Sequence, residues 1–360
     1  MVLAGFGIVG QGFAQLLMDE EKELAFSYGL VPQVVGILDS SGWVADEHGL
    51  NLKKAIKVKK DTGRLAGLGR KKSKQDEALK PSDVIRYLEA EVLIEATPTN
   101  FRTGEPGFSH MKAAFESKKH VVTCNKGPLS LAYYALHELA RHNGVQLRFS
   151  GAVGGGTPVL DFGKTCSIGD DLVGMKGILN GTCNYILTRM EEEGVSFDVA
   201  LEGAKKAGYA EANPSLDVDG YDSAVKLVIA ANHLQLSKAG VNDVEIKGIR
   251  DVSSKEVLKL KREGKAIRLL ATASLEKGLT VGPTVIERSH PLCINGANNA
   301  VEFQCRYSGP KVIIGKGAGG PETASSLLRD VLVIRGRMNG SLAPVQSPAV
   351  GGILSGGFAV

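Results

Sequence analysis

Short apolar runs alternate with helical patterns over the first 150 residues of the chain. Runs of strand length occur at 2–4, 33–38, 92–96, 121–123 and 145–149. Apolar residues at helical spacing occur between or after them, at 11–18, 81–88, 107–117 and 129–143. This alternation of strands and helices predicts an α/β domain built on a parallel sheet.

The pattern changes after the glycine-rich segment 151–158. Helical patterns begin near residues 158, 182, 197 and 222, and strand patterns occur at 176–179, 244–249, 265–275, 279–286, 299–307 and 311–314. The alternating apolar residues of 265–275, with a hairpin turn at Lys277-Gly278, favour an antiparallel or mixed sheet. We therefore expect a second domain of the α+β class.

Three other segments lack a clear apolar pattern. Residues 20–32 read as an insertion, residues 45–75 as an exposed basic excursion, and residues 349–360 as a glycine-rich tail. The lysines and arginines are scattered, and the net charge is only +4 over 360 residues. We therefore expect a small-molecule substrate rather than nucleic acid as the partner.

The composition is that of a globular protein, with 43% hydrophobic and 23% charged residues. The five cysteines are odd in number and have no C-x-x-C spacing, which fits a reducing compartment. We find no apolar run of bilayer-spanning length and no signal peptide before the first strand. The sequence thus predicts a cytoplasmic protein that does not act at a membrane.

A glycine fingerprint follows the first strand. The residues Gly5, Phe6, Gly7, Ile8, Val9 and Gly10 read G-x-G-x-x-G between a strand and a helix. Such glycines permit a tight turn and close approach to a pyrophosphate at the helix N-terminus. We expect a Rossmann-type dinucleotide-binding domain over 1–150, completed by 310–360, with the second domain at 151–309.

Several polar residues follow strands of the predicted sheet. Asp39 ends the second strand, where an acid can bind the adenosine ribose and favour NAD, or can simply end the strand. Nearby lysines, Lys57 especially, could instead reach the 2′-phosphate of NADP. Thr97, Pro98 and Lys126 follow later strands and should face the same crevice.

The most unusual stretch is 208–226, which reads G-Y-A-E-A-N-P-S-L-D-V-D-G-Y-D-S-A-V-K. Asp222 and Lys226 are i and i+4 at the start of a predicted apolar helix, and Glu211 and Asp217 precede them. Such a pair is commonly solvated. Here the apolar helix and the acidic loop favour a pocket that binds a small zwitterion.

Three further sequence features allow two interpretations each. The carbonyl groups of segment 151–158 could bind a monovalent cation, or the segment could be a tight crossover. Thr182 is either a helix N-cap or a hydroxyl group that binds a substrate carboxylate. The glycine-rich segment 315–320, which precedes a predicted helix at 322–331, either returns to the cofactor crevice or is a simple loop.

These motifs together resemble homoserine dehydrogenase, the NAD(P)-dependent enzyme that interconverts aspartate semialdehyde and homoserine on the route to threonine and methionine. The resemblance covers nearly the full chain, in the family's order. It rests on G-F-G-I-V-G, E-A-T-P-T-N, V-T-C-N-K, G-G-G-T-P, G-I-L-N-G-T-C-N-Y-I, the 208–226 stretch, S-H-P-L and G-A-G-G-P-E-T-A.

The resemblance implies roles for particular residues. Lys226 would donate the proton, Lys126 would stand beside the nicotinamide and the reacting oxygen, and Asp222 would shape their pocket. The implied substrate residues are Glu211, which would bind the ammonium, Asp217, Gly181, Thr182 and the backbone of Tyr209. Gly317 and Thr323 would contact the cofactor.

The resemblance also implies a cation site, a dimer and a stand-alone enzyme. Carbonyl groups of Val153, Gly155 and Thr157 would bind Na⁺, although Ser150 stands where relatives often carry a glutamate. The middle segment would form the substrate-binding and dimerisation domain of a homodimer. We expect a stand-alone enzyme without the kinase or ACT domain. The alternatives are another Rossmann-type amino-acid or aldehyde oxidoreductase, or a non-catalytic dinucleotide sensor.

Overall fold

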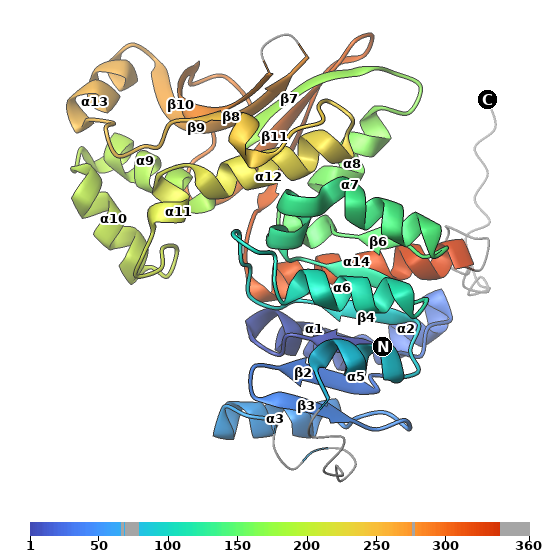
Figure 1. Cartoon of the computed structure of the whole chain (residues 1–360). Helices are drawn as coiled ribbons and strands as arrows, with labels where there is room; N and C mark the ends of the chain where they lie inside the picture. Colours follow the sequence, from blue (N-terminus) through green and yellow to red (C-terminus); the bar gives the residue numbers. More distant parts are fainter. Residues whose placement is uncertain (66–67, 69–78, 276–277, 339–360) are drawn as a thin grey trace, which may run out of the picture.

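The computed structural model describes residues 1–65, 68, 79–275 and 278–338. Two six-stranded sheets form the two lobes of the molecule, the first sheet in the lower lobe of Figure 1 and the second in the upper lobe. Lys277 of the predicted hairpin turn and the predicted tail 349–360 lie outside the described residues.

The first sheet is mostly parallel, as predicted. Its strands, in spatial order, are β3 (Gly42–Ala45), β2 (Gly36–Asp39), β1 (Val2–Ala4), β4 (Val92–Glu95), β5 (His120–Thr123) and β6 (Leu147–Arg148). Only the edge pair β2–β3 is antiparallel among these pairings. Central parallel strands are apolar along their length because helices cover both faces, and β1 and β4 are buried throughout.

Helices connect and cover these strands. They are α1 (Ile8–Asp19), α2 (Glu21–Tyr28), α3 (Leu52–Thr62), α5 (Pro81–Tyr87), α6 (Gly107–Glu116) and α7 (Lys126–His142). The expectation of a wholly exposed excursion at 45–75 was wrong, because α3 buries Ala55 and Ile56. The many lysines on its outer side hid this apolar face. The insertion at 20–32 likewise contains α2.

The second sheet is mixed, as predicted. Its strands, in spatial order, are β12 (Gly309–Lys316), β11 (Asn298–Cys305), β7 (Leu172–Ile178), β9 (Lys265–Ser274), β10 (Gly278–Glu287) and β8 (Val244–Ile246). The pair β8–β10 is parallel and the others are antiparallel. The alternating apolar pattern of 265–275 therefore gave the correct sheet type.

The second lobe also contains six helices among the described residues, of which α11 and α12 carry part of the acidic stretch. They are α8 (Val159–Cys166), α9 (Gly181–Glu193), α10 (Phe197–Lys206), α11 (Ser215–Val218), α12 (Tyr221–His233) and α13 (Ser254–Arg262), with the short 3₁₀ turn η2 (Val241–Asp243). The 3₁₀ turn η1 (Ser150–Ala152) precedes them and packs on α14 and β5. The sequence pattern missed α13, which buries only Val257.

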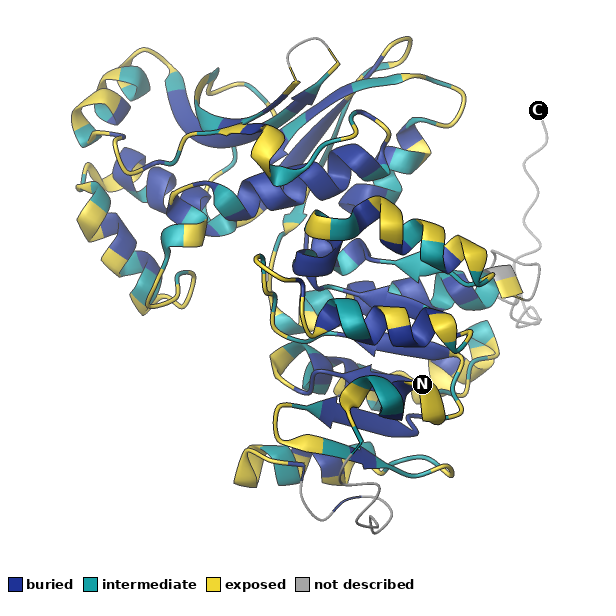
Figure 2. Cartoon of the chain, viewed as in Figure 1, coloured by how far each residue is buried: buried dark blue, intermediate teal, exposed yellow. Residues whose placement is uncertain are grey.

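Helix α12 lies where the two lobes meet. Every residue from Asp222 to Asn232 is buried, which Figure 2 shows as an almost continuous dark helix. It packs on α7 of the first lobe and on β9 and β10 of the second sheet. The charged residues at its start are therefore held inside the molecule, at the boundary between the lobes.

The last described helix, α14 (Gly320–Met338), returns to the first lobe. It packs along α1, and a Cβ on Gly12 would lie 3.5 Å from the carbonyl oxygen of Gly320. This packing agrees with assigning the C-terminal segment to the first domain, whose boundaries stay a prediction and whose residues 339–360 lie outside the described chain.

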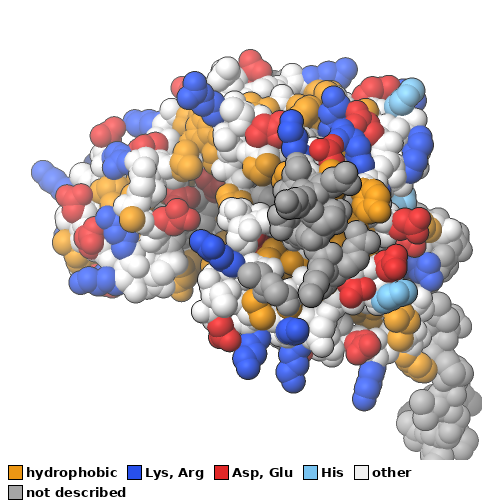
Figure 3. Space-filling view, turned by 60° about the horizontal axis from the view of Figure 1, so that its bottom comes forward, with side chains coloured by type: hydrophobic (Ala, Val, Ile, Leu, Met, Phe, Trp, Pro, Cys, Tyr) orange, Lys and Arg blue, Asp and Glu red, His pale blue; other side chains and the backbone are white. Residues whose placement is uncertain are grey.

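Charged side chains of both signs are interspersed on the face of the molecule shown in Figure 3. Within the described part of the chain, each helix is too short or too polar to cross a bilayer. The buried core instead follows the two sheets and α12 (Figure 2).

Candidate active site

The glycine turn between β1 and α1 is crowded at Gly5 and Gly10 and has free space at Gly7. Gly5 has a φ of +95°, and a Cβ there would lie 2.3 Å from the carbonyl oxygen of Ala96. A Cβ on Gly10 would lie 2.1 Å from the Gly5 carbonyl oxygen, whereas one on Gly7 would meet nothing within 4 Å. The intervening predicted residues are buried Phe6, exposed Ile8 and partly buried Val9. Open backbone before a helix N-terminus suits a pyrophosphate.

Asp39 ends β2 at the predicted ribose position, and its carboxylate is already paired. One oxygen accepts hydrogen bonds from the backbone N–H and the hydroxyl of Ser41, at 2.7 and 2.5 Å. The other oxygen lies 2.6 Å from Nζ of Lys59 on α3. Lys57 is exposed on the same helix. The lysine beside Asp39 is thus Lys59 rather than Lys57, because the helix turns Lys57 towards solvent.

Thr97 and Pro98 follow β4 at the carboxyl edge of the first sheet. The backbone N–H and the hydroxyl of Thr97 donate to the buried carboxylate of Glu95. The side-chain amide of Asn125 donates to the Thr97 hydroxyl oxygen at 3.2 Å, and the side-chain oxygen of Asn125 caps α7. The same buried network therefore fixes the turn and Lys126, the first residue of α7.

Asp222 bridges two lysines that come from different lobes. Its Oδ1 lies 3.0 Å from Nζ of Lys126, and its Oδ2 lies 2.7 Å from Nζ of Lys226. Lys226 Nζ also donates to the carbonyl oxygen of Leu179 at 2.8 Å, and Asn180 donates to Oδ2 at 3.0 Å. The Lys226 side chain is 10% exposed and that of Asp222 is 11% exposed. The i, i+4 pair is therefore buried, as a pocket requires.

The charges of this cluster stabilise one another. Burial opposes ionisation of Asp222, but the ammonium groups of Lys126 and Lys226 outweigh it and lower the pKa of the carboxyl. Asp222 in turn raises the pKa of Lys126 by more than burial lowers it. Burial, followed by repulsion from Asp222, raises the pKa of Asp217. At neutral pH the cluster holds an ionised Asp222 and a charged Lys126.

Local sequence signals set the helices that carry the cluster. Gly220 precedes α12 with a φ of +87°, a conformation that L side chains rarely adopt. Asn180 caps α9 by accepting a hydrogen bond from the backbone N–H of Cys183 at 2.9 Å. Its amide nitrogen also donates to Asp217 at 2.6 Å. The alternative in which Thr182 caps α9 was wrong, because Asn180 occupies the cap position.

The other predicted substrate residues are only partly brought together. The Thr182 hydroxyl donates to the carbonyl oxygen of Tyr209 at 2.5 Å. Gly181 lies against the turn that precedes β11, and a Cβ there would be 2.3 Å from the carbonyl oxygen of Ala297. Glu211 is exposed between α10 and α11, and it pairs with no other described residue. The structure thus joins Thr182 to Tyr209 and leaves Glu211 outside the cluster.

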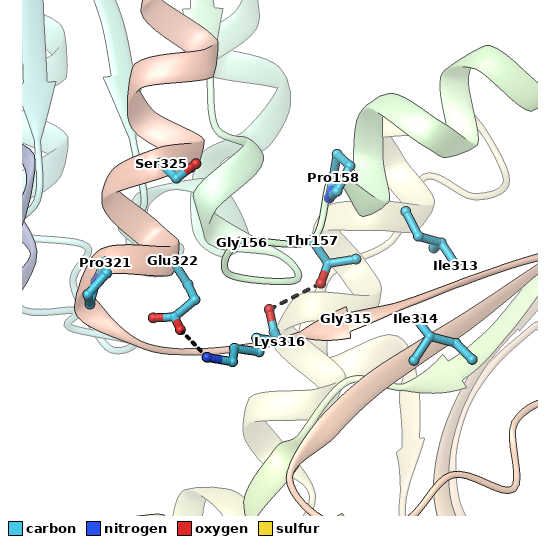
Figure 4. A pocket seen from close by; sticks show the side chains of 10 residues that line it. All are labelled: Gly156, Thr157, Pro158, Ile313, Ile314, Gly315, Lys316, Pro321, Glu322 and Ser325. Carbon is cyan, nitrogen blue, oxygen red and sulfur yellow. Dashed lines mark hydrogen bonds and ion pairs between the residues drawn. The ribbon is translucent and has the colours of Figure 1, made fainter. Parts of the chain in front are cut away.

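Loop 153–157 carries the carbonyl groups predicted to bind a cation. Val153 is buried, and the carbonyl oxygen of Gly155 already accepts a hydrogen bond from the Ser326 hydroxyl on α14. The Thr157 hydroxyl donates to the carbonyl oxygen of Lys316 at 3.1 Å, beside a cavity of about 540 Å³ (Figure 4). The loop is therefore tied to both β12 and α14.

The segment between β12 and α14 reaches the glycine turn. This agrees with the interpretation in which 315–320 returns to the cofactor crevice, and not with a simple loop. A Cβ on Gly320 would lie 2.6 Å from the Ile8 side chain. Gly317 lies against Asn299, since a Cβ there would be 2.1 Å from its Cγ. Thr323 is partly buried in the first turn of α14. Gly317 and Thr323 thus lie on a segment that closes over the start of α1.

Sequence reasoning missed four side chains that complete this region. They are Asn180, Glu95, Lys59 and Asn299. The first two had a local signal, an asparagine before a helix start and an acid at the end of a buried strand. Lys59 and Asn299 had none, because their surroundings come from distant segments. Asn299 is 1% exposed, and no described residue hydrogen-bonds to its side-chain amide.

Two family models match the chain. The model described as "Homoserine dehydrogenase" matches residues 158–332, and the model described as "Homoserine dehydrogenase, NAD binding domain" matches residues 5–150. Their order and extent agree with the two lobes.

The chain belongs to the homoserine dehydrogenase family.

Two curated relatives are similar over nearly their full length. The homoserine dehydrogenase of Methanocaldococcus jannaschii is 39% identical over 335 residues, which span 93% of this chain and 98% of the relative. The NAD(+)-dependent homoserine dehydrogenase of Pseudomonas canavaninivorans is 38% identical over 341 residues, with shares of 93% and 95%.

Solved structures of the homoserine dehydrogenase family share the fold. A crystal structure from Archaeoglobus fulgidus, assigned to homoserine dehydrogenase, is 38% identical, with a TM-score of 0.84 over 93% of this chain and 99% of that chain. A hyperthermophilic archaeal homoserine dehydrogenase mutant in complex with NADPH is 26% identical, with a TM-score of 0.79 over 92% and 96%. The predictions of an oxidoreductase and of NAD or NADP as cofactor are confirmed by these relatives.

Proposed function

We propose that this homoserine dehydrogenase performs the reversible NAD(P)-dependent reduction of L-aspartate 4-semialdehyde to L-homoserine through the Lys126–Asp222–Lys226 cluster. The observation that carries the proposal is the bridging of both lysines by one buried carboxylate where the two lobes meet. This reaction is the family's known activity, and it serves the synthesis of threonine and methionine.

Reduction of an aldehyde needs a hydride at carbon and a proton at oxygen. The bound nicotinamide supplies the hydride. We assign the proton to Lys226. Its ammonium has three N–H donors, and two of them are directed to Asp222 and to the Leu179 carbonyl oxygen. The remaining N–H can face the aldehyde oxygen, and Lys126 can stabilise the negative charge that develops there.

The remaining side chains would bind the substrate's amino-acid end. We assign its ammonium to Glu211 and Asp217, and its carboxylate to the helix start at Gly181 and Thr182, beside the Tyr209 backbone. Glu211 lies on the exposed loop before α11, so this role requires the loop to move towards the cluster. In the cofactor site, we assign the pyrophosphate to residues 5–10, the ribose to Asp39, and the nicotinamide side to Thr97, Pro98, Gly317 and Thr323.

Oligomeric state, cation and location are further parts of the proposal. We infer a homodimer formed through the second lobe, supported by the family and by exposed apolar Val285 and Ile314 on its sheet. A monovalent cation would bind at Val153, Gly155 and Thr157, where one carbonyl oxygen is already shared with a serine. A cytoplasmic enzyme is supported by its five cysteines, which are all free.

The reaction is tested by following absorbance at 340 nm with homoserine and either NAD or NADP. We expect homoserine-dependent formation of the reduced nicotinamide with at least one of them. Threonine, which has the same composition but a secondary hydroxyl group, serves as the control substrate. No change with homoserine and either cofactor, in a protein that binds the reduced cofactor, would reject the proposed reaction.

The pairing of Asp39 with Lys59 predicts the cofactor preference. Lys59→Met should raise the ratio of NADPH to NADH dissociation constants by about tenfold or more, since unit charges 4 Å apart interact by roughly 1 kcal/mol in bulk water and roughly 4 kcal/mol near a protein surface. The physical reason is that Asp39 would then repel the 2′-phosphate without compensation. Both constants are measured by fluorescence of the reduced nicotinamide.

Lys57→Met is the matched control for this prediction, because it removes the same charge from the exposed side of the same helix. We expect it to leave the ratio nearly unchanged. A larger effect from Lys57 than from Lys59 would assign the 2′-phosphate to the lysine that the sequence favoured.

A further inference from the structure

The two lysines of the cluster meet only if α7 and α12 keep their positions. Lys126 begins α7 in the first lobe, whereas Asp222 and Lys226 lie in the first turns of α12. Helix α7 is not one rigid rod, because Ala132 has non-helical dihedral angles (φ −139°, ψ 35°) that divide it. The Asn125 network holds Lys126 before the kink, and a contact beyond the kink would tie the rest of α7 to α12.

Such a contact exists at the far end of α12. The hydroxyl of Tyr133, directly after the kink, lies 3.2 Å from Nδ1 of His233, the last residue of α12. The His233 ring also packs edge-on against Phe149, with centroids 5.0 Å apart. Tyr133 stacks on His137, with centroids 4.1 Å apart. His233 is therefore enclosed by aromatic side chains of the first lobe.

A second hydrogen bond runs beside the first. The hydroxyl of Tyr134 lies 3.2 Å from the side-chain oxygen of Asn232, and Asn232 is held by two hydrogen bonds with the backbone of Ala239. Tyr134 is 46% exposed, whereas Tyr133 is 9% exposed. The contact of Tyr133 is therefore less accessible to water than that of Tyr134 and is the stronger constraint.

The Tyr133–His233 contact is between two neutral groups near neutral pH. Burial, assisted by the positive charges of Lys164 on α8 and of Arg148 on β6 and by His137 on α7, lowers the pKa of His233 to about 3, against the opposing Asp161. Burial likewise raises the pKa of Tyr133. Both groups are neutral at neutral pH, and the phenol donates to Nδ1 when the imidazole carries its proton on Nε2.

We propose that the Tyr133–His233 contact is a positioning device that holds the Lys126–Asp222–Lys226 cluster together from the opposite end of α12. The inference rests on the proposed function for its effect on turnover, while its structural part stands on the contacts alone. Neither residue belongs to the cluster or to the residues assigned to the substrate and the cofactor. Their effect passes through the two helices.

The test is Tyr133→Phe, which removes one oxygen and keeps the ring. We expect kcat to fall by about tenfold, since small displacements of catalytic groups cost up to ~10²-fold, with the dissociation constant of NADPH nearly unchanged. We also expect the alkaline limb of the kcat profile to move to lower pH. The reason is that Asp222, whose negative charge raises the pKa of Lys126, would lie farther from it. Tyr87→Phe, at an exposed tyrosine of α5, is the matched control.

Two variants of His233 separate positioning from general stability. His233→Asn can keep an acceptor near the Nδ1 position, and we expect it to retain most of the wild-type kcat. His233→Leu removes the acceptor and should behave as Tyr133→Phe does. The double variant Tyr133→Phe/His233→Leu should lose little beyond either single change, because both remove the same hydrogen bond.

A crystal structure of Tyr133→Phe tests the positioning role without an activity measurement. We expect the distance between Lys126 Nζ and Asp222 Oδ1 to exceed the ion-pair limit of about 4 Å, compared with 3.0 Å in the native protein. An unchanged distance, or an unchanged kcat and pH profile in an active enzyme, would overturn the inference. A wild-type enzyme that is inactive with homoserine would instead reject the proposed function and leave this distance as the deciding measurement.

Discussion

Lys226→Ala is expected to lower kcat for aldehyde reduction by roughly 10²–10⁴-fold, the usual contribution of a positioned general acid. The affinity for NADPH should stay nearly unchanged, because Lys226 lies at the start of α12 and not on the glycine turn. Stopped-flow absorbance at 340 nm measures the first effect, and nicotinamide fluorescence measures the second.

Lys226→Arg distinguishes proton donation from charge. Arginine keeps a positive charge but does not release its proton in proteins, so we expect this variant to be nearly as slow as Lys226→Ala. Most of the wild-type rate in Lys226→Arg would show that the residue acts as a charge alone. Lys238→Ala, at an exposed lysine just beyond α12, is the control and should keep full activity.

Asp222→Asn is expected to damage both activity and stability. The substitution leaves the buried Lys226 and the partly buried Lys126 without their shared anion, and breaking a buried ion pair costs about 3–5 kcal/mol. Turnover should fall as well, because the lysines then repel each other. Urea unfolding and kcat report the two effects separately.

The pH dependence of this variant follows from the directions of the pKa shifts. Because folding lowers the pKa of Asp222, its ionised form stabilises the native protein above the unfolded value of about 3.9. That contribution is lost as the pH falls through the folded pKa. Asp222→Asn should remove this acid-dependent part of the stability.

The alkaline side changes in the opposite direction. Asp222 raises the pKa of Lys126, so the stability gained from the charged lysine is present below its unfolded pKa of about 10.4 and lost as the pH rises through the folded value. In Asp222→Asn we expect the alkaline limb of kcat to move to lower pH. An unmoved limb would mean that Lys126 does not govern it.

Asp219→Asn is the matched control for both measurements. Asp219 is half exposed and pairs with Arg250 on the surface, and exposed pairs contribute about 0–1 kcal/mol. We expect a small change in unfolding free energy and nearly normal turnover. A loss equal to that of Asp222→Asn would show that negative charge in general, and not the bridge between the lysines, is what matters.

Much of the fold was readable from the chain because its signals are local. The strand–glycine turn–helix at 2–18 indicates a parallel sheet, and the alternating pattern of 265–275 indicates a mixed one. The helix α3 was missed, because two buried residues among many lysines leave a weak apolar stripe. Helix α13 was missed for the same reason, since it buries only Val257.

The candidate site was readable in part. The i, i+4 spacing of Asp222 and Lys226 is a property of one helix, so the sequence alone placed them together. The cap at Asn180 was confused with Thr182, because both can cap a helix and they lie two positions apart. Glu211 was grouped with the cluster from its nearness in sequence, yet the loop before α11 leaves it exposed.

The sequence by itself determined the nucleotide-binding turn, the two sheet types and the acid–lysine pair, since each depends on the geometry of a single short segment. The tertiary structure alone decided that Lys126 shares Asp222, that Lys59 faces Asp39, and that Tyr133 meets His233. These pairs join segments far apart in the chain. Their distances depend on how apolar helix and sheet faces pack, which residue spacing does not specify.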